Sequence, residues 1–378
     1  MSTGGSGLSI ALLASNRHPI KQPFAGGLEA HVWHLARALQ SRGHRVTLFA
    51  ADGSDHAAAE ATLRVRTFSP SATASTDSSM PERRFLADHH AYLTVMTDLS
   101  ATGPTSFDII HNHSLHYLPL AMAPALPVPM LTTLHTPPTP WLESALDISK
   151  GIGSAFVAVS RFTARSWRHV VRGVDVVPNG IDLRAWPVGP GGRDLVWFGR
   201  LTPEKGAHLA IAAARRARRR LHLAGPISDV RYFRDTIEPQ LGPEAAYHGH
   251  LDQTALASLV GSCAAALATP LWDEPYGLVV AEALACGTPV AAFDRGGIPE
   301  ILDSDCGRLV APGDVEALAV GAAEAATLSR AHARARATAA CGHHSMVDAY
   351  LDRYRRLIAT WSSSRPGSAS ADPRRGAA

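Results

Sequence analysis

Cysteine is scarce in this chain of 378 residues, and its spacing does not suit a disulfide-stapled fold. The four cysteines are Cys263, Cys286, Cys306 and Cys341, and no two of them form a CxxC pair. Small secreted domains are held by denser and more regular cysteine patterns. The simplest setting for these thiols is a reducing one, so we expect a cytoplasmic protein.

Long hydrophobic runs are also lacking. A transmembrane helix needs about 20 apolar residues, and the most apolar candidate, residues 118–134, is broken by Pro119, Pro124, Pro127 and Pro129. The N-terminus has no basic segment before its first apolar run, so it lacks the layout of a signal peptide. We expect no membrane span, while weak contact with a membrane surface stays open.

Neither sign of charge is in large excess. Lys and Arg number 36 against 33 Asp and Glu, which gives a formal net charge of +3 and no argument for a nucleic-acid partner. With 46% hydrophobic and 18% charged residues, the composition excludes a disordered chain. The length suits two domains, each able to bury its own core.

The order of apolar segments predicts an α/β protein. Residues 7–14 indicate a buried strand, residues 28–43 an amphipathic helix and residues 44–50 the next strand. Such a βαβ unit implies a parallel sheet. After the turn at Asn179-Gly180, residues 194–201 begin the same pattern again. We therefore expect two doubly wound, Rossmann-like domains.

The stretch 269–300 indicates a cradle for an elongated anionic ligand. Pro275 keeps Glu274 extended, Gly277 precedes the apolar helix LVVAEALA, and Glu282 lies within that helix. Free amide groups at a helix start favour phosphate oxygens, and glycine lets phosphate approach the backbone. We expect Glu282 to hold a ribose diol and Glu274 a sugar. The alternative is that both glutamates are solvated helix-end charges.

Two further strand ends carry groups suited to phosphate. Gly26-Gly27 follows the first predicted strand, where open α/β sheets bind ligands, although glycines also make plain tight turns. Arg200 and Lys205 follow the strand 194–201, where a guanidinium and an ammonium could neutralise a diphosphate. The alternative is that Arg200 and Lys205 are simply solvated side chains of a surface loop. The arginines at 215, 216, 218, 219 and 220 indicate a solvated helix end, with binding to an anionic membrane or partner as the lesser alternative.

Metal binding has only weak support. His111 and His113 would share one face of a strand, with His116 nearby. No carboxylate or further ligand stands at a recognisable spacing, and histidines at a strand end can also bond sugar hydroxyls. Asp303-Ser304-Asp305 has a DxD form but stands in a polar turn. We therefore predict no metal and no cofactor.

Several segments resemble the motifs of glycosyltransferase family 4, whose members are retaining enzymes of the GT-B fold. The resemblance spans about residues 7–345. It includes EPYGLVVAEALACGTPV, similar to the E-x7-E motif, and GRLTPEKG, similar to G-R-L-x-x-x-K-G. TLH at 133–135 resembles a T-x-H segment, PNGID at 178–182 resembles P-N-G-(I/V)-D, and AAYHGHLD resembles a loop that meets the nucleobase.

The resemblance implies a GT-B protein with two Rossmann-like domains facing a central cleft. Residues 1–180 would bind the acceptor, residues 181–345 the donor, 346–361 would form a helix crossing back to the first domain, and 362–378 a disordered tail. The implied catalytic residues are His135, Glu274, Arg200 and Lys205. The implied donor-binding residues are Gly26, Gly27, Gly199, Arg200, Lys205, His248, Gly249, Leu251, Glu274, Tyr276, Gly277, Leu278 and Glu282.

The implied reaction is transfer of a hexose-type sugar, with retention, from a nucleoside diphosphate sugar to an acceptor hydroxyl without a metal. A UDP-sugar is favoured and a GDP-sugar comes next. The acceptor, whether sugar, lipid or small metabolite, is not identified by these motifs. A nucleotide-sugar epimerase of the same fold and a non-catalytic binding protein remain the alternatives.

Overall fold

Two parallel sheets, one in each half of the chain, organise the structure. The computed structural model describes residues 7–55, 68–79 and 82–364. Each sheet has six strands, in the order β2-β1-β3-β4-β5-β6 and β12-β11-β10-β7-β8-β9. Most of these strands are buried apolar runs, as parallel strands covered on both faces require. The predicted α/β class and the restart of the pattern are confirmed.

The N-terminal half alternates strands and helices. Its strands are β1 (Ser9–Leu13), β2 (Arg45–Phe49), β3 (Ile109–Asn112), β4 (Met130–Leu134), β5 (Ser154–Ala158) and β6 (Asp175–Val176). Its helices are α1 (Gly27–Ser41), α2 (Arg83–Ser106), α3 (Tyr117–Met122), α4 (Pro140–Ser149) and α5 (Arg161–Trp167). The predicted βαβ unit is present, with Ser9 opposite Arg45 in a parallel pair.

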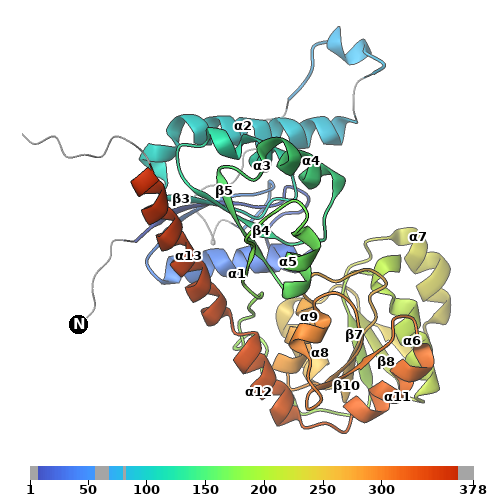
Figure 1. Cartoon of the computed structure of the whole chain (residues 1–378). Helices are drawn as coiled ribbons and strands as arrows, with labels where there is room; N and C mark the ends of the chain where they lie inside the picture. The colour runs from blue at the N-terminus through green and yellow to red at the C-terminus, as the bar shows by residue number, and fades with distance from the viewer. Residues whose placement is uncertain (1–6, 56–67, 80–81, 365–378) are drawn as a thin grey trace, which may run out of the picture.

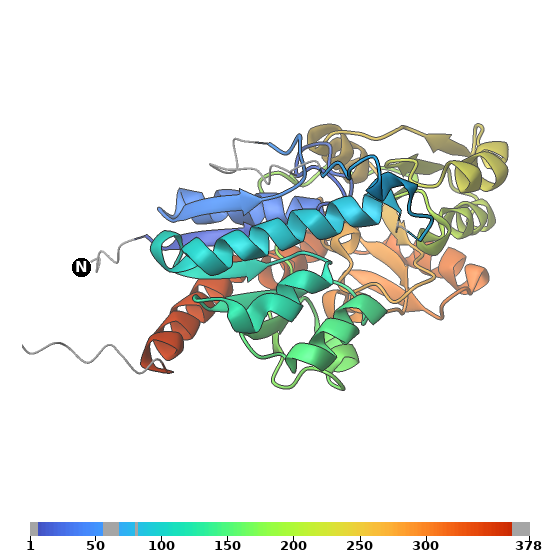
Figure 2. The ribbon, with the colours of Figure 1, turned by 90° about the horizontal axis from the view of Figure 1, so that it is seen from above.

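The C-terminal half repeats this plan. Its strands are β7 (Leu195–Phe198), β8 (Leu221–Ala224), β9 (Ala245–Tyr247), β10 (Ala265–Ala268), β11 (Val290–Phe293) and β12 (Gly307–Val310). Its helices are α6 (Ala207–Arg216), α7 (Val230–Tyr232), α8 (Gln253–Gly261), α9 (Leu278–Ala285), α10 (Ile298–Ile301), α11 (Val315–Ala325) and α12 (Arg330–Ala340). Seen from above, the two halves lie side by side (Figure 2).

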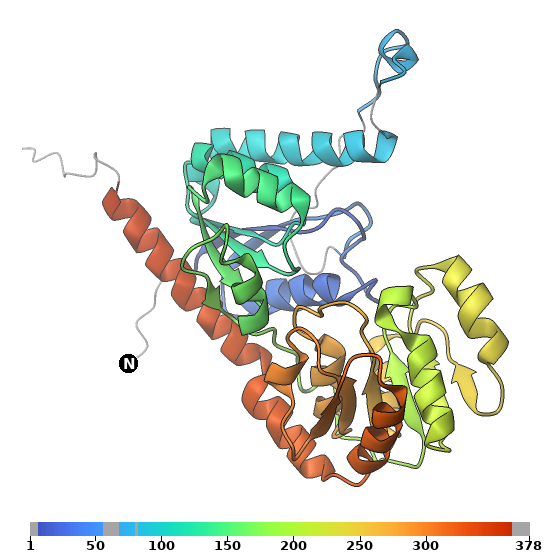
Figure 3. The same ribbon diagram turned by 45° about the vertical axis from the view of Figure 1, so that its right-hand side comes forward.

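A long last helix, α13 (His343–Ser364), returns to the N-terminal half (Figures 1 and 3). Its residues Val347, Tyr350, Leu351 and Tyr354 are buried in the cluster formed by β1, β2 and α1. The helix begins and ends about three residues outside the predicted range 346–361. Residues 362–364, predicted to open the tail, are helical, and residues 365–378 lie outside the described part of the chain.

The chain crosses between the halves twice, and the two crossings are paired. Ile181 N–H donates to the Cys341 carbonyl at 2.8 Å, and His343 N–H donates to the Ile181 carbonyl at 3.1 Å. A Cβ on Gly180 would lie 2.4 Å from the His343 Cα, so only glycine allows this approach. The turn expected at Asn179-Gly180 is thus a packed junction.

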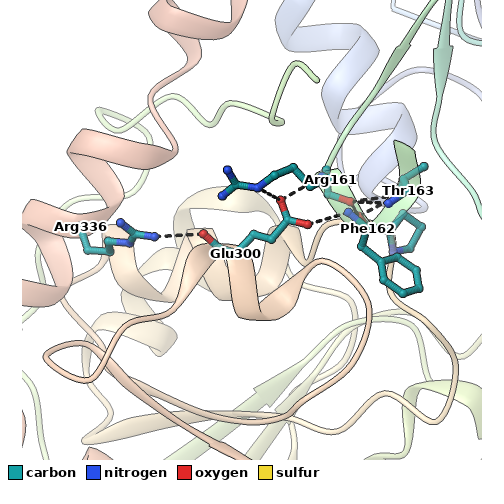
Figure 4. A network of polar contacts seen from close by, with 7 residues as sticks. Arg161, Phe162, Thr163, Glu300 and Arg336 are labelled. Atoms are coloured by element: carbon teal, nitrogen blue, oxygen red, sulfur yellow. Dashed lines mark hydrogen bonds and ion pairs between the residues drawn. The ribbon is translucent and has the colours of Figure 1, made fainter. Parts of the chain in front are cut away.

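A second contact joins the halves beside the predicted donor loop. The Glu300 carboxylate of α10 accepts hydrogen bonds from the N–H groups of Arg161 and Phe162, at 2.9 and 2.7 Å, at the start of α5 (Figure 4). The Ser160 hydroxyl, which caps the same helix, donates to the Pro275 carbonyl at 2.5 Å. An acidic group at a helix N-terminus is favourable electrostatically, so the start of α5 binds the C-terminal half.

We expect Glu300→Ala to loosen this contact while leaving each half folded. Hydrogen bonds to a charged group contribute about 1.5–3 kcal/mol, and their loss should increase the radius of gyration measured by small-angle scattering of the free protein. Glu316→Ala, which removes an exposed ion pair inside the C-terminal half, is the control. Equal radii for the two variants would contradict the role given to Glu300.

Candidate functional site

A cleft with a cavity of about 400 Å³ lies between the two halves and is lined by both. The carboxyl ends of the central strands β1, β4, β7 and β10 contribute Ser15, His135, Gly199 and Thr269 to its wall. Ligands of open α/β sheets bind at these strand ends. The predicted site residues that line the cleft are Gly26, Gly27, His135, Gly199, Arg200, Lys205, Leu251, Glu274, Tyr276, Gly277, Leu278 and Glu282.

Two predicted donor-binding residues, His248 and Gly249, are not among the lining residues. The His248 ring instead meets His222 of the neighbouring strand β8, with 2.9 Å between their ring nitrogens. The next histidine, His250, does line the cleft, and its Nε2 lies 3.1 Å from the Phe24 carbonyl oxygen in the other half. His250 and Leu251 of this loop thus line the cleft, whereas His248 does not. Gly249, between the two histidines, has φ +76°, so the chain turns there and the two rings face different ways.

Two helix starts face each other across the cleft. Gly26 precedes α1 and Gly277 precedes α9, and neither helix has a side-chain cap. A Cβ added to Gly27 would lie 2.6 Å from Cδ1 of Leu278, so the two starts are in contact. Both positive dipole ends therefore point toward the same volume, which favours an anion there.

Glu274 is held by two donors. The Lys205 ammonium lies 2.5 Å from its Oε2, and the Trp272 indole N–H donates to the same oxygen at 3.0 Å. Lys205 and Glu274 are about four-fifths buried, with side-chain exposures of 20% and 18%. The backbone of Glu274 is fixed as well, because its carbonyl accepts from Gly297 N–H at 2.7 Å. Its carboxylate is therefore oriented before any ligand binds.

Arg200 is the freer of the two cations. Its guanidinium lies 3.9 Å from the Glu204 carboxylate and is 39% exposed, so this pair is weak. The strand end that carries Arg200 is set by close backbone contact, since a Cβ on Gly225 would lie 1.9 Å from the Gly199 carbonyl oxygen. Gly225 also has φ +139°, which favours glycine. Arg200 can thus reorient toward an anion in the cleft.

Glu282 stands on the cleft wall within α9, one to two turns beyond Gly277. Desolvation by burial raises the pKa of its carboxyl to about 8. A carboxyl with this pKa is largely protonated at neutral pH in the free protein. It can then both donate and accept a hydrogen bond.

His135 belongs to a cluster of histidines that the sequence only partly indicated. Its Nε2 lies 2.9 Å from Nδ1 of His113, and the His31 ring of α1 packs against both. Burial lowers the pKa of His31 to about 3 and that of His113 and His135 well below the usual range, so all three are neutral.

Of the three histidines considered together from the sequence, His111, His113 and His116, only His113 belongs to this group of three rings. His116 stacks on Tyr92 and Tyr117 and caps α3, whereas His31 completes the cluster. The sequence feature that could have indicated His31 is its position one turn after Gly27, on the helix that begins at the cleft.

The remaining sequence candidates lie outside the cleft lining. Asp303 bonds the Asp305 backbone within its own turn and pairs with Arg336 at 3.5 Å, so the DxD segment forms a turn. In the arginine run, Arg215 and Arg216 pair with Glu244 and Glu316. Across the described residues, every helix is too short or too polar to cross a membrane.

Comparison with known protein families identifies both halves. Residues 25–185 match Glycosyltransferase Family 4, and residues 192–327 match Glycosyl transferases group 1. A glycogen synthase of Mycobacterium tuberculosis is 30% identical over 335 residues, covering 78% of this chain and 81% of that protein. A phosphatidyl-myo-inositol mannosyltransferase of Mycolicibacterium smegmatis is 30% identical over 317 residues, covering 78% and 79%.

Solved structures share the two-sheet arrangement. A sucrose-phosphate synthase from Thermosynechococcus elongatus aligns with a TM-score of 0.73 and 22% identity over 93% of this chain and 99% of that one. An Anabaena protein solved with UDP and glucose aligns with a TM-score of 0.71 and 19% identity over 93% and 100%. The predicted GT-B fold is confirmed by this likeness together with the two sheets.

The raised pKa of Glu282 predicts a pH-dependent stability. The folded protein favours the protonated carboxyl, so this contribution is fully present below about pH 4.5 and is lost as the pH rises to about 8. Relative to Glu282→Gln, the wild type should lose about 2 kcal/mol of unfolding free energy over this range, a value below the full shift because the side chain is partly exposed.

Urea unfolding without ligand at several pH values measures this loss. Glu238→Gln, which changes an exposed carboxylate, is the control and should track the wild type. A wild type that runs parallel to Glu282→Gln at every pH would show that Glu282 is not desolvated.

Proposed function

Because the chain belongs to glycosyltransferase family 4 and is a glycosyltransferase of the GT-B fold, we propose that it moves a hexose-type sugar from a UDP-sugar to an acceptor hydroxyl with retention. The observation that carries the proposal is the cleft, where two uncapped helix starts converge with the side chains of Arg200, Lys205, Glu274 and Glu282. Such a set matches the charges and hydroxyls of a nucleoside diphosphate sugar.

The diphosphate takes the most positive part of the cleft. Amide groups at the start of α9 and the side chains of Arg200 and Lys205 would bind its oxygens, and they would stabilise the charge that develops as the bond to C1 breaks. An ammonium has three donors, so Lys205 can keep its bond to Glu274 while it contacts phosphate. No metal is required for this charge stabilisation.

The hydroxyl-binding roles go to the acids and to His135. Glu282 would bond the ribose diol, and Glu274, already oriented by Lys205 and Trp272, would bond the sugar hydroxyls. His135, neutral and on the cleft wall, would contact the sugar near its reacting carbon. In front-face attack the acceptor oxygen bonds C1 on the side that the diphosphate leaves, so no protein nucleophile is needed.

The halves divide the substrates between them. The N-terminal half, residues 1–180, would bind the acceptor, and residues 181–345 the donor, with movement about the paired crossings at Ile181 and His343. Closure would exclude water, which would otherwise compete as acceptor. UDP is preferred over GDP because a protein with this fold, from Anabaena, was solved with UDP and glucose.

Removing either cation should slow transfer at saturating donor about 100-fold, since one charge-stabilising donor contributes about 3 kcal/mol. We expect this for Arg200→Ala and for Lys205→Ala in a steady-state assay of released nucleoside diphosphate. Arg231→Ala, at an arginine 89% exposed, is the matched control and should keep the wild-type rate. Near-full activity in Arg200→Ala and Lys205→Ala would remove the diphosphate assignment.

The donor and the stereochemistry are tested separately. Among UDP, GDP and ADP, we expect UDP to give the largest rise in melting temperature, because ligands that bind the folded state stabilise it by mass action. Proton NMR of the product should show an α-linkage from an α-linked donor. A β-linkage would overturn retention, and isomerised donor without an acceptor would instead indicate an epimerase.

A further inference from the structure

Three histidines from distant parts of the chain bring their ring nitrogens together beside the cleft. His31 lies on α1, His113 follows β3 and His135 follows β4. One ligand atom from each lies within 4.8 Å of the others. Zn²⁺ bonds imidazole nitrogen at about 2.0–2.1 Å, which places tetrahedral ligand atoms about 3.3 Å apart. Small ring rotations would therefore bring the three nitrogens onto one ion.

His31 is the feature that points to a ligand. It is 3% exposed, and within the described part of the chain neither of its ring nitrogens has a hydrogen-bond partner. A buried polar group without a partner costs about 1–3 kcal/mol. A hydrophobic side chain would fill the same space without this cost, so packing does not account for a histidine here.

The cluster also has a supporting shell. Nε2 of His113 meets Nδ1 of His111 at 3.1 Å, which leaves Nδ1 of His113 on the side of His135. His111 is fixed in turn by the Thr133 hydroxyl at 2.8 Å and the Tyr354 hydroxyl at 2.5 Å. Metal-binding histidines are oriented by such partners of their second nitrogen.

Access and chemistry select the kind of ion. His31 and His135 line the cleft, so an ion can enter and keep a water molecule as a fourth ligand. Three neutral imidazoles suit Zn²⁺ and other late transition ions, whereas Mg²⁺ and Ca²⁺ require oxygen ligands.

We propose that His31, His113 and His135 form a binding site for one Zn²⁺ ion per chain, open to the cleft. A bound Zn²⁺ ion replaces the contact between the His113 and His135 rings. It also takes the lone pair of a His135 ring nitrogen, which is then not free to accept a hydrogen bond from the substrate. Zn²⁺ therefore inhibits sugar transfer rather than supporting it. This inhibitory consequence rests on the proposed contact of His135 with the donor sugar, whereas ion binding does not.

The full chain, freed of metal, is titrated with Co²⁺ and followed by its visible absorption, and then with Zn²⁺ in competition with a chromophoric chelator. We expect one ion per chain, a tetrahedral Co²⁺ spectrum and a rise in melting temperature with Zn²⁺. His31→Phe should bind at least 100-fold more weakly. Its metal-free melting temperature should equal or exceed that of the wild type, because the His31 nitrogens have no hydrogen bonds to lose.

His222→Ala is the matched control. His222 lies in the C-terminal sheet, where one of its ring nitrogens contacts His248 and the other contacts the Asp194 carboxylate. It should keep wild-type binding. Absence of binding, binding that survives His31→Phe, or binding lost in His222→Ala would each overturn the site.

Transfer is then measured with and without saturating Zn²⁺, each variant against its own metal-free rate. The wild type should lose most of its activity and His31→Phe should lose little. Stoichiometric binding without inhibition would leave the ion site standing and would contradict the role given to His135.

Discussion

The contact between the starts of α1 and α9 is the constraint on which the rest of the site depends. Gly27 and Leu278 meet so closely that a side chain at position 27 would displace the leucine side chain or push the halves apart. Each helix leaves the carboxyl edge of its own sheet, so the contact also brings the two carboxyl edges together. Two positive helix ends placed side by side repel one another, and an anion between them relieves this repulsion.

Other charges in the cleft are arranged around the same electrostatic requirement. Lys205 is neutralised by Glu274, Glu282 is held largely protonated by burial, and the histidines are uncharged. These groups therefore add little fixed negative charge that could oppose a diphosphate. A further acidic side chain, Glu29 in the first turn of α1, also lines the cleft. Arg200 remains a partly exposed cation with a weak partner, so it can move onto an arriving ligand, and the exposed Arg17 also lines the cleft.

Sequence reasoning was most successful where neighbours in the chain determine the result. The βαβ units follow from apolar periodicity, and Glu274, Gly277 and Glu282 reach the cleft because one loop and one helix carry all three. It failed where the partner comes from elsewhere. His31 and His113 are 82 positions apart in the chain but contact one another. The contact of His248 with His222 depends on how the chain turns after β9. The contact of Glu300 with α5 depends on how the halves meet.

The last helix shows why the C-terminal segment belongs to the site as well as to the core. Tyr350 and Tyr354 of α13 are fully buried against the N-terminal sheet, and Tyr354 bonds the histidine that supports His113. The same helix begins at the crossing beside Ile181. A change in the angle between the halves therefore acts at the start of α13. The middle turns of the same helix hold His111, which supports His113 and through it His135. Movement of the halves and the orientation of His135 are in this way connected through one continuous helix.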